Sequence, residues 1–72
     1  MNSEHIVHNR VKLARVEKGY TQQELADLVE VTRQTIGLIE AEKYNPTIVL
    51  CLSLSEVLDK RLDELFWLEG GK

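Results

Sequence analysis

The sequence predicts an all-α protein, a compact bundle of five short helices in a single domain. Three observations predict this class. Apolar residues recur at helical spacing along most of the chain, capping and helix-ending residues separate the segments, and no stretch alternates apolar and polar residues as a half-buried strand does. With 72 residues, the chain has room for one domain.

The first two helices are marked by residues that begin and end them. Apolar residues at helical spacing predict a helix over residues 9–18, and Gly19 follows as the residue that ends it. Thr21 and Glu24 have the spacing of a capping box, in which each side chain accepts the backbone N–H of the other residue. The box opens a second helix that runs to about Val29.

The third helix follows so closely that it must cross the second. Thr32 can cap a helix over residues 33–41, whose apolar residues Ile36 and Ile39 face inward. Only residues 30–32 separate the two helices, too few for an antiparallel hairpin with extended contact. A steep crossing of this kind is the helix-turn-helix geometry.

The last two helices follow a turn at Asn45 and Pro46, because the residue before a proline is pushed out of the helical region. A fourth helix over residues 47–58 is the most apolar segment, and a short fifth helix is expected over residues 62–68.

These elements divide the chain into three parts. The domain is expected over residues 9–68, with the helix-turn-helix motif at about residues 21–41. Residues 1–8 are expected to be a frayed N-terminus, and residues 69–72 a flexible tail.

The third helix is expected to present its N-terminal half to solvent, which is the end that enters a major groove when such a motif binds DNA. Arginine can pair with guanine, glutamine with adenine, and threonine can meet a thymine methyl group. The residues expected to contact bases are Arg33, Gln34, Thr35 and Leu38. An ordinary solvated first turn of a helix has a similar composition, so the predicted crossing geometry is what favours DNA.

Four motifs stand in one register: residues 21–26 (TQQELA), 31–36 (VTRQTI), 39–40 (IE) and 43–46 (KYNP). Together they resemble the Cro and lambda-repressor-like helix-turn-helix regulators, or Xre family, and are most similar to its minimal single-domain subgroup. The resemblance spans about residues 9–68. It implies a five-helix, lambda-repressor-like fold and a regulator that binds double-stranded DNA.

The resemblance also implies roles for single residues. The implied contacts to DNA phosphates come from Arg10, Gln22, Thr32, Lys43, Tyr44 and Asn45. Arg15 and Glu40 match an ion pair that ties the first helix to the end of the third, a packing device and not a DNA contact. Two departures stand out: Glu30 occupies a turn position where the family usually has glycine, and residues 59–61 (DKR) replace its Gly-Val-Ser linker.

The formal charge of −3 does not by itself indicate nucleic-acid binding. Residues 1–43 hold 6 basic and 7 acidic groups, and residues 44–72 hold 3 and 5, so most of the excess acid lies away from the motif. Because the local field decides binding, we expect few phosphate contacts, weak non-specific binding, and reliance on base readout and dimerisation.

A homodimer is expected for two reasons. A domain of this size buries only about 60 % of the surface that its unfolded chain exposes, so a second copy would add stability. The apolar cluster at the C-terminal end of the domain supplies a contact, at Leu65, Trp67 and Leu68. A twofold dimer would place two recognition helices about 34 Å apart on a palindromic operator, where occupancy alone represses a promoter.

Other classes of function find less support in the sequence. The longest apolar run, residues 48–52, is far shorter than the roughly 20 residues of a membrane span. His5 and His8, with Cys51 in a core stripe, do not complete a zinc site, so we expect no metal and no cofactor. No catalytic constellation appears, and a cytoplasmic, nucleoid-associated protein that is not an enzyme is expected.

Two alternatives stay open. The chain could be an antitoxin or immunity component that binds a partner protein and regulates its own operon, and an adjacent toxin-like gene would favour this. It could also be a protein-interaction module without DNA binding, which the acidic charge favours.

Overall fold

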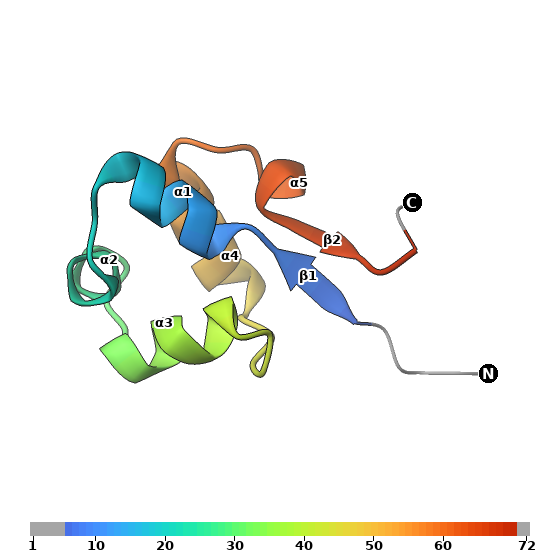
Figure 1. Ribbon diagram of the computed structural model, residues 1–72, viewed down its shortest axis with the longest axis horizontal. Helices are drawn as coiled ribbons and strands as arrows, with labels where there is room; N and C mark the ends of the chain where they lie inside the picture. The colour runs from blue at the N-terminus through green and yellow to red at the C-terminus, as the bar shows by residue number, and fades with distance from the viewer. Residues whose placement is uncertain (1–5, 71–72) are drawn as a thin grey trace.

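The computed structural model describes residues 6–70, which form five helices and two short strands (Figure 1). In chain order these are β1 (Val7–Asn9), α1 (Val11–Lys18), α2 (Gln22–Leu28), α3 (Arg33–Glu40), α4 (Ile48–Leu58), α5 (Leu62–Leu65) and β2 (Phe66–Leu68). The predicted all-α, five-helix class is confirmed. The two strands form a small antiparallel ribbon that the sequence did not predict.

The predicted caps begin and end the helices. The Thr21 hydroxyl accepts the Glu24 N–H at 3.0 Å and the Glu24 carboxylate accepts the Thr21 N–H at 2.8 Å, which completes the capping box of α2. The Thr32 hydroxyl accepts the Thr35 N–H at 3.3 Å at the start of α3. Gly19 ends α1 in the left-handed conformation, with φ of 78°.

Three residues with side chains also adopt the left-handed conformation. Glu30, at the turn position where the family usually has glycine, has a φ of 62°, Glu42 has the same φ, and Asp59 has 55°. Such residues each cost of order 1–3 kcal/mol, so the surrounding contacts must hold them in place. Arg61 begins α5 in place of a capping serine, and its N–H donates to the carboxylate of Glu64 at 2.7 Å.

A single core lies among the five helices, and α2 crosses α3 steeply, seen end-on in Figure 1 while α3 runs across the view. The fully enclosed residues come from every helix: Val11, Leu25, Ala26, Ile36, Ile39, Leu54, Leu58 and Leu65. The small Ala26 permits the close crossing, and its carbonyl accepts the Val31 N–H at 3.0 Å in the turn. The core therefore fixes the angle at which α3 is presented.

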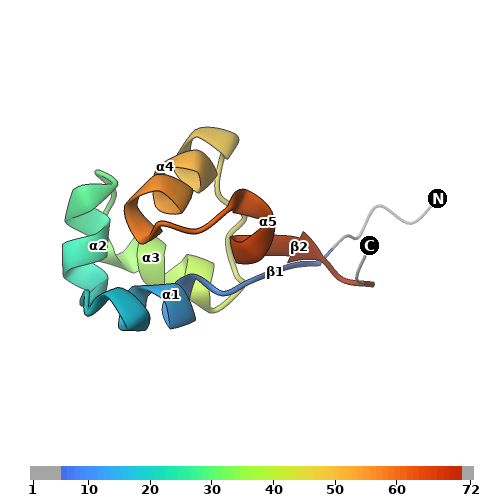
Figure 2. The ribbon, with the colours of Figure 1, turned by 90° about the horizontal axis from the view of Figure 1, so that it is seen from above.

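The ends of the chain differ from the prediction. The fifth helix ends at Leu65 and not at residue 68, because the chain turns extended at Phe66, with φ of −133°. Residues 66–68 then pair with residues 7–9, in the register Val7↔Leu68 and Asn9↔Phe66. Residues 7 and 8, expected to fray, are thus part of a strand, while residues 1–5 lie outside the described part of the chain. The ribbon extends from the end of the bundle opposite to α2 (Figures 1 and 2).

Candidate nucleic-acid interface

The exposed side of α3 carries the residues predicted to contact bases. Arg33, Gln34 and Leu38 are exposed, whereas Ile36 and Ile39 on the opposite side are fully buried. Helical periodicity places these two sets on different faces. Thr35 is only partly exposed, and its hydroxyl lies 3.0 Å from that of Thr32 at the start of the helix.

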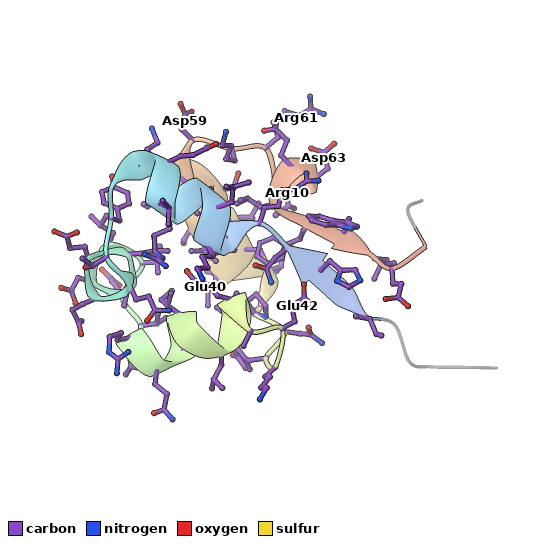
Figure 3. The ribbon with its side chains drawn as sticks, in the orientation of Figure 1. Arg10, Glu40, Glu42, Asp59, Arg61 and Asp63 are labelled. Atoms are coloured by element: carbon purple, nitrogen blue, oxygen red, sulfur yellow. The ribbon has the colours of Figure 1, made fainter. Side chains whose placement is uncertain are left out.

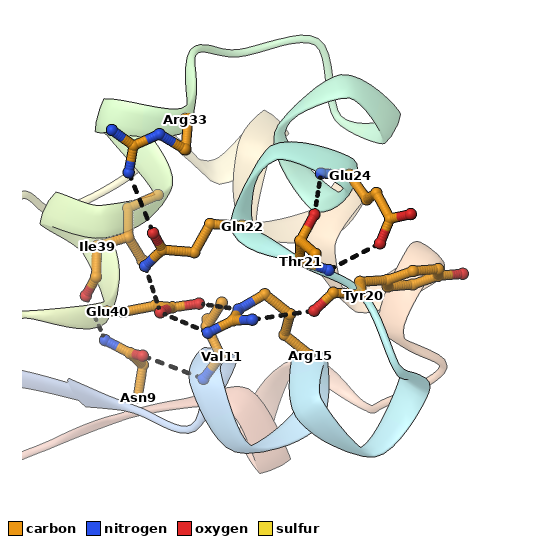
Figure 4. A network of polar contacts seen from close by, with 10 residues as sticks. All are labelled: Asn9, Val11, Arg15, Tyr20, Thr21, Gln22, Glu24, Arg33, Ile39 and Glu40. Carbon is orange, nitrogen blue, oxygen red and sulfur yellow. Dashed lines mark hydrogen bonds and ion pairs between the residues drawn. The ribbon is translucent and has the colours of Figure 1, made fainter.

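A polar network joins this face to the interior (Figure 4). The Arg15 guanidinium donates to both carboxylate oxygens of Glu40, with N–O distances of 2.7 and 3.3 Å, and to the Tyr20 carbonyl at 2.9 Å. The side chains of Arg15 and Glu40 are only 12 % and 5 % exposed. The ion pair implied by the family resemblance is therefore present, and it fastens α1 to the C-terminal end of α3.

The network continues from Glu40 to the surface. The Gln22 amide donates to Glu40 Oε1 at 3.0 Å, and the Arg33 guanidinium donates to Gln22 Oε1 at 3.4 Å. Gln22 is the first residue of α2 and Arg33 the first of α3, so two side chains predicted to contact DNA stand beside each other. The Gln22 amide has a second N–H that remains free to donate to a phosphate. Glu40 thus sets the position of both residues from the interior.

The other residues predicted to contact phosphates divide into two groups. Lys43, Tyr44 and Asn45 are exposed in the loop that follows α3, and Thr32 is exposed at the start of α3, so these four lie around the helix. Arg10 lies elsewhere: Figure 3 shows it at the junction of β1 and α1, on the side away from α3.

Arg10 has a different neighbour from the one expected. Its guanidinium carbon lies 4.6 Å from the centre of the Trp67 ring, a cation–π arrangement. Its backbone N–H donates to the Leu65 carbonyl at 2.9 Å. The structure therefore does not bring Arg10 together with the α3 residues, and an adjacent aromatic ring holds its side chain instead.

The residues predicted to form the dimer contact are also divided. Leu65 is fully buried, because it is the residue of α5 that packs into the core, and it is therefore not available to a second copy. Trp67 is half-buried, and Leu68 is 45 % exposed. Of the residues expected in the dimer contact, Trp67 and Leu68 of β2 thus remain accessible.

These two residues border an apolar groove that the sequence did not reveal. The groove has a volume of about 620 Å³ and is lined by Val7, Ile48, Cys51, Leu62, Phe66, Trp67 and Leu68, with Arg61 and Asp63 at its edge. Beyond Ile48, the exposed side chains of Val49 and Leu52 extend the apolar surface along α4. Because α4 is apolar on every side, its periodicity could not show which side would stay outside the core.

The part of the chain over residues 6–70 contains no cluster of three or more His, Cys, Asp or Glu side chains suited to a metal ion. Cys51 is buried, and loss of solvent raises the pKa of its thiol, which disfavours the reactive thiolate. None of the described helices is long and apolar enough to cross a membrane.

Comparison with known proteins agrees with the fold and the motif. A family model described as Helix-turn-helix matches residues 11–65. The HTH-type transcriptional regulator YgzD of Bacillus subtilis is 39 % identical over 61 residues, which cover 85 % of this chain and 92 % of that protein.

Two solved structures with more than 30 % identity align with three quarters of the chain. The N-terminal DNA-binding domain of SinR from Bacillus subtilis has 36 % identity and a TM-score of 0.69, covering 75 % of this chain and 80 % of that domain. The restriction-modification controller protein C.AhdI from Aeromonas hydrophila has 31 % identity and a TM-score of 0.70, covering 75 % and 82 %.

A steeply crossed helix pair with an exposed second helix, on a five-helix core, defines a helix-turn-helix protein. The chain belongs to the Helix-turn-helix family of Xre-like regulators. It is a DNA-binding transcriptional regulator of the HTH type.

Proposed function

We propose that the chain binds specific sequences of double-stranded DNA through the N-terminal half of α3. The observation that carries this proposal is the exposed pair Arg33 and Gln34, beside a Gln22 that Glu40 anchors from the interior. A guanidinium and an amide are the groups that read guanine and adenine in the major groove. Side chains held in place before binding lose less entropy on binding, which favours specific contacts.

Phosphate contacts would flank this helix at both ends. Thr32 lies at its N-terminal end, Gln22 lies beside it between the side chains of Arg33 and Glu40, and the loop with Lys43, Tyr44 and Asn45 follows its C-terminal end. Lys43 is the cation among these residues, so the affinity should depend only weakly on salt and base contacts should supply much of the specificity.

Substitution of one base-reading side chain tests this part of the proposal. Fragments of the host genome selected by the purified protein would provide the cognate site. Gln34→Ala should weaken binding to that site by about 1–3 kcal/mol, roughly 5- to 150-fold, and relax the preference at one base pair. Lys43→Ala should weaken binding to all sequences alike. Gln23→Ala, an exposed glutamine on α2, is the matched control and should bind as the wild type does. An equal loss on all DNA from Gln34→Ala would contradict direct readout.

The proposed active species is a homodimer on a palindromic operator. In this proposal, the contact surface consists of the apolar groove and the adjoining exposed side chains of α4, Val49 and Leu52. Leu52 is 54 % exposed. The edge of the groove carries Arg61 and Asp63, whose charges pair at 2.9 Å within one chain. A twofold-related copy could exchange these partners, so the edge is complementary to itself.

Sedimentation tests the homodimer. The wild type should sediment as a dimer at tens of micromolar, and Leu52→Asp should give a folded monomer, because it places a charge within the apolar contact. The matched control is Leu13→Asp on α1, where the leucine is equally exposed but lies on another face and should leave the dimer intact. A monomeric wild type, with and without DNA, would refute the homodimer.

The proposed action at a promoter is repression by occupancy, which would place the protein on the nucleoid. Occlusion needs only a bound dimer over the promoter. A reporter fused to a selected promoter should lose expression when the protein is produced, and a gain would overturn this part of the proposal.

The same groove also favours a second candidate function, in which a partner protein such as a toxin occupies it. Co-purification of a 1:1 complex with the product of an adjacent gene, in place of a homodimer, would support this antitoxin function. A protein-interaction module without DNA binding would be indicated if gel shifts at low salt gave no complex with any DNA.

A further inference from the structure

Two side chains of β1 reach the C-terminal end of α3. The Asn9 amide donates to the Ile39 carbonyl at 2.8 Å, in the last turn of the helix, and this carbonyl also accepts the Glu42 N–H at 3.0 Å. His8 Nδ1 lies 3.1 Å from each carboxylate oxygen of Glu42. Glu42 directly precedes Lys43, the start of the loop proposed to contact phosphates. β1 therefore contacts both the end of the recognition helix and the residue that leads into this loop.

The other ring nitrogen of His8 faces a second carboxylate. His8 Nε2 lies 3.0 Å from Glu69 Oε1, directly after β2, and the Glu69 N–H donates to the Ile6 carbonyl at 2.8 Å. Glu69, expected in the flexible tail, is thus tied to the ribbon. Because the two ring nitrogens point away from each other, the carboxylates do not converge on one point as metal ligands would.

This arrangement requires two donors on one ring. Carboxylates only accept hydrogen bonds, and a neutral imidazole has a single N–H, so only the protonated ring can donate to both sides. Loss of the proton leaves a nitrogen lone pair against a carboxylate oxygen. One of the two contacts must then weaken or break.

The carboxylates around His8 favour the protonated form of its ring. The hydrogen bonds to Glu69 and then to Glu42 raise the pKa of His8 above its ordinary value of 6.5. The Trp67 ring packs at 6.0 Å from the His8 ring, and the Arg10 guanidinium lies over that tryptophan. The carboxylates of Glu42 and Glu69, from the loop after α3 and the end of β2, are thus the charges in direct contact with the ring.

The backbone of Glu42 is in the left-handed conformation, with φ of 62°. Backbone hydrogen bonds from Glu42 to Ile39 at 3.0 Å and from Lys43 to Leu38 at 2.9 Å close the turn. The link to His8 adds the side-chain restraint that joins this corner to the ribbon.

We propose that His8 is a positioning residue for residues 42–45, and that its protonation fixes this loop and so strengthens binding to DNA. The effect on DNA rests on the proposed function, whereas the effect on the loop does not. The linkage has a definite sign: the restraint is complete below pH 6.5 and is lost as the pH rises through the higher pKa of folded His8.

Nuclear magnetic resonance of the free protein tests the positioning. In the wild type, amide shifts of residues 43–45 should follow the titration midpoint of the His8 ring. Glu42→Gln should lower the titration midpoint of the His8 ring, and the amide shifts of residues 43–45 should no longer follow it. Glu69→Gln should also lower the midpoint, but the amide shifts of residues 43–45 should still follow it. His5→Gln, at the neighbouring histidine of the sequence, is the matched control and should change neither. Loop shifts that ignore the His8 midpoint in the wild type would overturn the proposal.

Binding to a selected DNA fragment at constant ionic strength tests the consequence. The wild type and His5→Gln should bind several-fold more tightly at pH 6 than at pH 8, and His8→Gln should lose most of this dependence. Equal dependence in the wild type and His8→Gln would overturn the effect on DNA. Failure to bind DNA at any pH would refute the proposed function, while the resonance measurement still decides whether His8 positions the loop.

Discussion

Removal of Arg15 tests the interior end of the network that supports the recognition helix. The Glu40 side chain is only 5 % exposed in the wild type, and in Arg15→Ala its carboxylate loses its charged partner and keeps only the Gln22 amide. The Tyr20 carbonyl loses its donor as well. Removal of one partner of a buried pair costs about 3–5 kcal/mol, because the remaining charge is left without compensation.

Thermal and urea unfolding followed by circular dichroism would measure this loss. For a domain of this size, each 1 kcal/mol lowers the melting temperature by about 4–8 °C, so Arg15→Ala should melt at least 10 °C lower. Arg15→Met combined with Glu40→Leu should recover much of the loss, since it removes both charges. The matched control is Arg61→Ala, whose pair with Asp63 is exposed and should contribute less than about 1 kcal/mol. Melting of Arg15→Ala like the wild type would refute the reasoning.

Three smaller predictions concern stability. Asp59→Gly should stabilise the fold by about 0.5–1 kcal/mol, because relief at φ of 55° exceeds the added entropy of glycine, and a lower melting temperature would contradict this. Thr21→Ala should cost about 1 kcal/mol in urea unfolding through the lost cap of α2, and an unchanged midpoint would show that Glu24 alone caps the helix. Raising the pH above 6.5 should destabilise the wild type more than His8→Gln, since folding raises the pKa of His8, and parallel pH profiles would exclude the link.

Local signals in the sequence predicted most of the helices. Gly19, Thr21 and Thr32 act within one turn of their own position, so their roles could be read from spacing alone. The ribbon could not, because its strands have three residues each and pair across nearly the whole chain. Phe66 pairs with Asn9, far away in the sequence, and its neighbours in the chain carry no strand signal. The local pattern therefore favours a helix that continues past residue 65.

The candidate site was predictable to the extent that it depends on helical periodicity. The exposed residues of α3 and the inward Glu40 lie where the pattern places them. Arg10 and Leu65 do not, because the ribbon places a tryptophan beside Arg10 and α5 packs Leu65 into the core. Both outcomes depend on contacts between distant segments.

The ribbon also joins the two ends of the domain to each other. Val7 pairs with Leu68, and the Glu69 N–H reaches the Ile6 carbonyl, so the first and last helices are joined outside the core. Separation of either strand exposes the backbone of the other, which couples the loosening of α1 to that of α5. Hydrogen exchange at His8 and Trp67, whose N–H groups face the partner strand, should therefore occur at matched rates, and the two ends of the domain should open as one cooperative unit.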